Sequence, residues 1–208
     1  ISALTEILFG MLVISFLYLS LTKRIILSLL VISWLPFVRS EGFIFILIIA
    51  FYYIVHRKWK YLPFLLFGTL VINSMGWYLS GEPLWLISTN PYVNTAITAY
   101  GSGSFFHFFL WGIPVFGLGF ILLLLQSWSF FKSEKWFHNA FHADFLSWDA
   151  LRIWFVYGFF WSFFFAHVFL WWQGMWASLG LTRVMFCIVG PFVLIIHERI
   201  FSTHGVIF

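Results

Sequence analysis

Residues 25–56 read IILSLLVISWLPFVRSEGFIFILIIAFYYIVH, two apolar runs on either side of the charged turn Arg39-Ser40-Glu41. Neither run alternates apolar and polar residues as a half-buried strand does, and both are too long for the strands of a barrel. The stretch therefore predicts two helices joined by a charged turn. The same pattern of apolar runs and short polar breaks extends along the rest of the chain.

The composition excludes a water-soluble globule. Of the 208 residues, 62% are hydrophobic, 25% are aromatic and only 9% are charged, whereas soluble domains are about 45–50% apolar and about 25% charged. The mean hydropathy is +0.99. These values exclude a soluble enzyme, a disordered chain and a nucleic-acid-binding protein, and they predict an integral membrane protein. The single cysteine, Cys187, excludes an intrachain disulfide and a cysteine-based zinc site.

Seven apolar segments predict an all-α, polytopic transmembrane bundle of about seven spans, forming a single domain over residues 1–208. The segments are residues 4–22, 25–38, 42–56, 61–79, 105–125, 151–172 and 184–196. Between the fifth and the sixth, residues 126–149 carry aromatic side chains at helical spacing, interrupted by charges. This pattern is typical of an amphipathic segment lying on the cytoplasmic surface of the membrane.

The distribution of basic residues predicts the orientation. Alternate breaks hold nine of the eleven Lys and Arg residues, and only Arg39 and Arg183 lie in the other set of breaks. Because cytoplasmic loops carry the excess of Lys and Arg, the side with nine should be cytoplasmic. The chain begins at Ile1 without the pattern of a signal peptide, and we expect it to be the central or C-terminal part of a longer protein.

The turn at Arg39 is the first candidate site. A bilayer core of about 30 Å takes about 20 helical residues, and the 14 residues of 25–38 are too few. We therefore expect Arg39 and Glu41 to lie below the outer surface, in a polar cavity. A guanidinium suits phosphate or carboxylate, and the neighbouring carboxylate can orient it or accept a proton. In the alternative interpretation, the pair only satisfies a buried turn.

Further candidates lie in the outer breaks. Arg183 lies at the start of the last outer-to-inner segment. There it either binds an anionic group or extends its side chain to the membrane–water interface. The others are Glu82, Asn90, Tyr92, Tyr100 and His107. Aromatic side chains in such loops either stack on a sugar or anchor the chain at the interface. The small residues 101–104 precede a predicted helix. They either bind a phosphate through their backbone amides or form an ordinary turn.

Three other groups carry weaker functional signals. Glu6 either pairs with an arginine or touches water, and the second interpretation is favoured. His167 lies among Phe, Trp and Ala and is typical of a hydrogen-bonded core histidine. His138 and His142 are four residues apart, a spacing that can hold a metal ion, but no third ligand is evident.

Four motifs, in order, resemble segments of the GT-C glycosyltransferases, multispanning enzymes that use polyprenyl-phosphate-linked sugars. ALTEILF at 3–9 is similar to their (S/T)EPLF segment, and LPFVRSEG at 35–42 to their RPEG turn. GEPLW at 81–85 with NPY at 90–92 is similar to their GDPLWF…NPY loop, and residues 167–183 to their late H…W…GS.GL.RY segment. Ile7 and Ser40 stand where the family has proline, and Met185 lies where an aromatic residue is common.

The resemblance implies a mannosyltransferase-like enzyme of the bacterial inner membrane that transfers a sugar to an acceptor on the extracytoplasmic side. It implies that Glu41 and Glu82 are the catalytic carboxylates, which also help to hold a divalent metal if the reaction uses one. It assigns substrate or phosphate binding to Arg39, Arg183, Asn90, Tyr92, Tyr100 and His107. The implied partners are the polyprenyl-phosphate donor, membrane lipids and a membrane-protein complex, with no nucleic acid.

One departure leaves two alternatives open. The family carries a catalytic Asp on its first outer loop, and nothing in this sequence matches that loop. A GT-C-like scaffold subunit without turnover fits that absence. The other alternative is a transporter or flippase for a lipid-linked solute, which inverted repeats or broken helices at the middle of the membrane would support.

Overall fold

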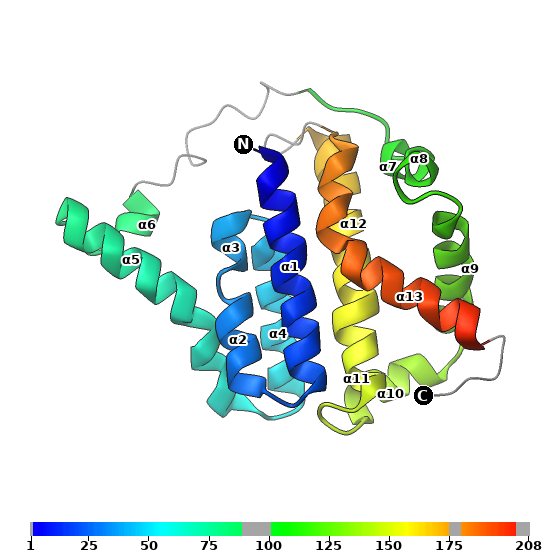
Figure 1. Cartoon of the computed structure of the whole chain (residues 1–208), viewed down its shortest axis with the longest axis horizontal. Helices are drawn as coiled ribbons and strands as arrows, with labels where there is room; N and C mark the ends of the chain where they lie inside the picture. The colour runs from blue at the N-terminus through cyan, green and yellow to red at the C-terminus, as the bar shows by residue number, and fades with distance from the viewer. Residues whose placement is uncertain (1, 89–100, 175–179, 203–208) are drawn as a thin grey trace.

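The computed structural model describes residues 2–88, 101–174 and 180–202, and in these ranges the chain is helical and contains no strand. The prediction of an all-α fold is therefore confirmed for the described residues. The helices of residues 2–21, 42–55 and 158–173 pack side by side, the helix of residues 67–80 extends away from them, and the helix of residues 189–202 runs obliquely to them (Figure 1).

The first part of the chain, up to Ser88, folds into a series of helices. Its elements are α1 (Ser2–Leu21), α2 (Ile25–Ile32), α3 (Leu35–Val38), α4 (Gly42–Val55), the 3₁₀ helix η1 (Trp59–Leu66), α5 (Phe67–Ser80) and α6 (Trp85–Ser88). Helix α2 packs against α1 and η1, and α4 packs against η1 and α12. The turn at Arg39 reverses the chain between α3 and α4, at the end of the bundle where α1 begins (Figure 1).

The second half is built around α12. Its elements are α7 (His107–Leu110), α8 (Gly112–Phe116), α9 (Gly119–Lys132), α10 (Lys135–His142), α11 (Trp148–Leu151), the π-helical η2 (Arg152–Tyr157), α12 (Gly158–Gln173), the 3₁₀ helix η3 (Thr182–Ile188) and α13 (Val189–Ser202). Helices α11, η2 and α12 follow one another without a break. Helix α1 contacts η3 and α13, which joins the two halves of the bundle.

Aromatic packing forms the centre of the bundle. The Phe45 ring of α4 stacks on Phe159 of α12 with their centroids 4.2 Å apart, and Phe9 of α1 meets Phe45 edge-on at 5.4 Å. The buried residues of α12 recur every three or four positions, the period of one helix face. In the Phe-rich sequence of α12, Phe159 and Phe163 pack against rings of α1 and α4, while Phe160 and Phe164 pack against rings of the helices that follow residue 101.

The predicted fifth segment, residues 105–125, is not one helix. It is divided among α7, α8 and the first half of α9. Pro114 lies in the first turn of α8, where its missing N–H has no helical partner to lose, so it favours a new start. Gly117 has φ 63° and ψ −156°, a conformation that side chains disfavour, and the chain turns there. Helix α9 then continues past the break expected at Gln126.

Residues 25–38 are also divided, into α2 and α3. The Ser33 hydroxyl donates to the Leu30 carbonyl at 2.7 Å and accepts from the Gly68 amide at 3.1 Å. Pro36 lies in the first turn of α3. The break between α2 and α3 is therefore stabilised by a hydrogen bond within the turn and by one to the start of α5.

Residues 126–149 contain the end of α9, all of α10 and the start of α11. Helix α10 exposes Phe137 and Phe141, while its Ala140 carbonyl accepts a hydrogen bond of 2.8 Å from the Trp154 indole. The amphipathic helix in this segment is therefore eight residues long, and it is fastened to η2.

Two helices are long and apolar enough to cross a membrane. They are Trp59–Ser80, with 22 residues, and Trp148–Gln173, with 26 residues. Four shorter apolar helices accompany them: Thr5–Leu21, Ile25–Val38, Gly42–Val55 and Gly119–Lys132. Large apolar side chains are exposed on several of these helices, including Met11, Leu47 and Leu70.

Candidate functional site

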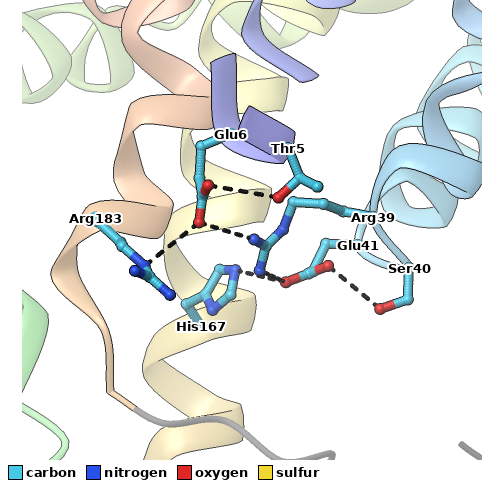
Figure 2. Close-up of polar contacts among 7 residues, drawn as sticks. All are labelled: Thr5, Glu6, Arg39, Ser40, Glu41, His167 and Arg183. Atoms are coloured by element: carbon cyan, nitrogen blue, oxygen red, sulfur yellow. Dashed lines mark hydrogen bonds and ion pairs between the residues drawn. The ribbon is translucent and has the colours of Figure 1, made fainter. Parts of the chain in front are cut away.

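A charged cluster lies at the end of the bundle where α1 and α4 begin and α12 ends (Figure 2). It consists of Glu6, Arg39, Glu41, His167 and Arg183, and we call these five residues the Arg39 cluster. They come from α1, the α3–α4 turn, α12 and η3. The packing of these elements therefore brings together charges that are far apart in the sequence.

Glu6 is the most deeply buried carboxylate of the cluster, with only 3% of the residue exposed. One of its oxygens, Oε1, accepts a hydrogen bond from Arg39 Nη1 at 3.1 Å and lies 3.6 Å from Arg183 Nε. The Thr5 hydroxyl donates to the other oxygen at 3.4 Å. Glu6 is thus the carboxylate shared by both arginines.

Arg39 is held by the geometry of its turn. It ends α3 in an extended conformation, and its carbonyl accepts a hydrogen bond of 2.9 Å from the Gly42 amide. A Cβ atom at Gly42 would lie 2.5 Å from the Leu35 carbonyl carbon, so only glycine fits this close approach. Arg39 Nη2 donates to Glu41 Oε1 at 2.8 Å, and the guanidinium therefore bridges Glu6 and Glu41.

Glu41 has contacts on both oxygens. Its Oε1 lies 3.5 Å from His167 Nε2 in addition to the bond from Arg39, and Oε2 accepts from the Ser40 hydroxyl at 3.2 Å. His167 comes from the buried face of α12 and is 6% exposed. A carboxylate with this set of contacts is oriented to hold the Arg39 guanidinium in place.

Arg183 differs from Arg39 in its exposure. Its side chain is 46% exposed, against 19% for Arg39. Only its contact to Glu6 fixes it to the cluster, and its terminal nitrogens donate no hydrogen bond to any residue that the structure describes. A half-exposed guanidinium whose terminal nitrogens have no partner among the described residues, backed by a buried carboxylate, is suited to binding an anion such as phosphate.

Glu82 lies apart from the cluster, on the α5–α6 turn. Its carboxylate accepts a hydrogen bond from the Ser88 hydroxyl, and its amide donates to the Ser80 hydroxyl at 3.2 Å. Asn73 fastens the same turn, because its side-chain amide donates to the Pro83 carbonyl at 2.7 Å. No contact between described residues joins Glu82 to Arg39, Glu41 or Arg183, so the structure does not bring together the two carboxylates chosen from the sequence.

His107 lies beside the cluster without joining it. Its Nε2 is 2.8 Å from the Gly180 carbonyl oxygen, which ties the start of α7 to the segment leading into η3. The adjacent Phe108 ring is 6.0 Å from the His167 ring, centroid to centroid. Of the remaining residues predicted for this site, Asn90, Tyr92 and Tyr100 lie outside the described residues.

No three His, Cys, Asp or Glu side chains converge to hold a metal ion within residues 2–88, 101–174 and 180–202. The rings of His138 and His142 stack with their centroids 4.5 Å apart, and His142 Nδ1 lies 3.2 Å from the His138 carbonyl oxygen. The two rings thus lie on the exposed surface of α10, and His142 Nδ1 contacts a carbonyl of the same helix.

The sequence did not lead us to expect Glu6 and His167 in the Arg39 cluster. Glu6 was expected to touch water, yet it is the carboxylate that both arginines share. The signal that could have identified it is its position as the one charged residue in a 20-residue apolar helix. His167 has no such signal, since only the fold shows that it faces Glu41.

Comparisons with known proteins return no relative: no family model, no curated protein and no solved structure matches this chain.

Proposed function

We propose that the protein is an integral membrane glycosyltransferase of the GT-C type, which moves a sugar from a polyprenyl-phosphate donor to an acceptor outside the cytoplasm. The proposal combines the four sequence motifs with the Arg39 cluster. Three of those motifs contribute residues to the cluster: Glu6, the Arg39–Glu41 turn, and the segment with His167 and Arg183.

The membrane location is supported by helix length and by the surface. Two helices are long and apolar enough to span, and exposed side chains such as Leu47 (69%), Leu70 (62%) and Leu118 (76%) would face lipid. In the proposed orientation of about seven spans, the Arg39 cluster faces the extracytoplasmic side, and nine of the eleven basic residues face the cytoplasm of a bacterial inner membrane.

The observation that carries the proposal is the pair of arginines on one buried carboxylate. Glu6 fixes Arg39 on its inner side and Arg183 at the surface. Charged groups at membrane depth are costly, and they are found where a substrate or ion needs them. A lipid phosphate has its tail in the bilayer and its charge at the boundary, which matches a guanidinium exposed at the end of an apolar bundle.

In the proposed reaction, the residues of the cluster have different roles. An acceptor hydroxyl forms the new bond to the anomeric carbon, the bond from that carbon to the phosphate oxygen breaks, and its electron pair leaves with the lipid phosphate. Arg183 binds the phosphate and stabilises the charge that develops on it. Glu41 positions Arg39, since both of its oxygens already have contacts. The acceptor proton passes to a general base that the proposal assigns to none of the described residues, because Glu41 is already paired with Arg39 and Glu82 lies apart from the cluster.

Release of polyprenyl phosphate tests the proposal. The full-length protein, purified in detergent, is given a polyprenyl-phosphate mannose and an oligosaccharide acceptor, and the lipid product is quantified. Loss of one preorganised charge donor costs about 10²–10³ in rate, so Arg183→Gln should slow release by that factor. The matched control Lys132→Gln removes an exposed charge outside the cluster. Equal rates for wild type and Arg183→Gln would contradict the assignment.

A scaffold subunit without turnover is the second candidate, and one observation favours it. Both carboxylates of the cluster are paired with arginines, so the cluster is electrically balanced as it stands. A scaffold would bind the donor lipid or a partner subunit and release nothing. Donor binding by the full-length protein without any product, in the presence of a range of acceptors, would select this alternative.

A further inference from the structure

The opposite end of the bundle, where α1 and α4 end, has two helix ends built in the same way. After α1, the Arg24 amide donates to the Leu19 carbonyl at 2.8 Å, and Lys23 has φ 59°. After α4, the Lys58 amide donates to the Tyr53 carbonyl at 2.8 Å, and Arg57 has φ 56°. Helices that end in this way favour glycine at the left-handed position. Here basic residues occupy both positions.

A groove opens beside the first of these ends. Its volume is about 350 Å³, and it is lined by Lys23, Arg24, Ile25, Ile26, Leu27 and Tyr61. The Lys60 ammonium lies over the Tyr61 ring, 5.1 Å from its centroid, and adds a third cation at this wall. Because α2 packs against both α1 and η1, the groove lies between the junction of α1 with α2 and Tyr61 of η1.

The charge of the groove is not neutralised. The sequence has no Asp or Glu between Glu6 and Glu41, nor between Glu41 and Glu82. Lys23 and Arg24 are exposed, and neither forms an ion pair with a residue that the structure describes. The groove is therefore a concentration of positive charge that an anion from outside the chain would stabilise.

Exposed apolar side chains of α1 and α2 lie at the groove. Ile26 and Leu27 are each 46% exposed, and Leu21 at the end of α1 is 45% exposed. Two exposed cations thus lie directly against exposed aliphatic side chains. A ligand that fits both surfaces has a negatively charged head and a hydrocarbon tail.

We propose that this groove binds the anionic headgroup of a phospholipid in the cytoplasmic leaflet. Lys23 and Arg24 hold the phosphate, the Tyr61 hydroxyl reaches the polar headgroup, and the acyl chains lie along Ile26 and Leu27. Basic grooves between helices on the cytoplasmic side are suited to anionic lipids. The inference rests on the proposed membrane location and orientation but not on glycosyl transfer, since it concerns the end of the bundle away from the Arg39 cluster.

Lipid titration followed by native mass spectrometry tests the proposal on the full-length protein. The probes are dioleoylphosphatidylglycerol, dioleoylphosphatidylcholine as a zwitterionic control, and inorganic phosphate. Each cation near an anionic lipid surface contributes about a factor of five to affinity. The double substitution Lys23→Gln/Arg24→Gln should therefore weaken phosphatidylglycerol binding about 25-fold. Lys132→Gln/Lys135→Gln, which removes two exposed cations at the α9–α10 junction, is the matched control and should change it less than twofold.

A second variant separates lipid binding from folding. Lys23→Gly places glycine where the backbone favours it, so it should fold at least as well as wild type and still bind phosphatidylglycerol about fivefold more weakly. Equal losses in the groove and control variants would overturn the proposal in favour of unspecific charge attraction. Binding of inorganic phosphate as tight as that of phosphatidylglycerol would also overturn it, in favour of a site for a soluble anion.

Discussion

Replacing Arg39 with methionine leaves Glu6 and Glu41 without their shared cation. The Glu6 side chain is 4% exposed and that of Glu41 is 15% exposed, so water replaces the lost hydrogen bonds only in part. Breaking a buried ion pair by removing one partner costs about 3–5 kcal/mol. We expect Arg39→Met to lower the free energy of unfolding by an amount in this range.

A double-mutant cycle isolates the contact between Arg39 and Glu6. The variants are Arg39→Met, Glu6→Gln and the combination, each unfolded at equilibrium in mixed micelles. A hydrogen bond between charged groups contributes about 1.5–3 kcal/mol, and the coupling energy should lie in that range. The control cycle uses Arg152 and Asp149, which are also 3.1 Å apart, but the Asp149 side chain is 50% exposed. Its coupling should be about 0.2–1 kcal/mol.

The comparison of the two cycles tests whether burial strengthens the contact between Arg39 and Glu6. Both pairs have the same separation, so a difference in coupling reports burial and not distance. Two results would contradict this expectation: equal coupling energies in the two cycles, or a coupling energy between Arg39 and Glu6 below about 0.5 kcal/mol. Either result would mean that burial of the cluster does not strengthen this contact.

Three further predictions concern the backbone, the packing and the topology. Lys23→Gly should raise the free energy of unfolding by about 1 kcal/mol, because it relieves a left-handed conformation, and a chemical denaturation curve measures it. Gly42→Ala should lower stability by at least about 1–3 kcal/mol, since its Cβ would clash with the Leu35 carbonyl; an unchanged denaturation midpoint would contradict this. In intact cells, a membrane-impermeant thiol reagent should label Asn94→Cys and spare Lys58→Cys, and the reverse labelling would refute the proposed orientation.

The helical class of the fold could be predicted from the sequence because apolar runs of 14 or more residues leave little choice of secondary structure. The internal breaks were harder to predict. In the run of residues 105–125, hydropathy continues across Gly117, while the backbone turns there because glycine permits it. The break at Ser33 depends on the Gly68 amide, a partner 35 residues away that no local pattern indicates.

The candidate site shows the same division between local and distant information. Arg39 and Glu41 are two residues apart, and their pairing follows from the turn that joins two short helices. The shared role of Glu6 depends on how α1 packs against the turn and η3, and hydropathy does not encode this packing. Glu82 was grouped with the arginines because its loop was expected on the same side of the membrane. Sharing a side does not bring two loops together, and Glu82 pairs with Ser88 instead.

Photo-crosslinking tests directly whether the Arg39 cluster is a lipid-phosphate site. A polyprenyl-phosphate analogue with a photoreactive group beside its phosphate is irradiated with the full-length protein, and labelled peptides are mapped by mass spectrometry. We predict labelling within Thr182–Ile188 and the Arg39 turn, abolished by excess polyprenyl phosphate and strongly reduced in Arg183→Gln. Labelling confined to the α5–α6 turn around Glu82, or labelling of the Arg39 cluster that Arg183→Gln leaves unchanged, would contradict it.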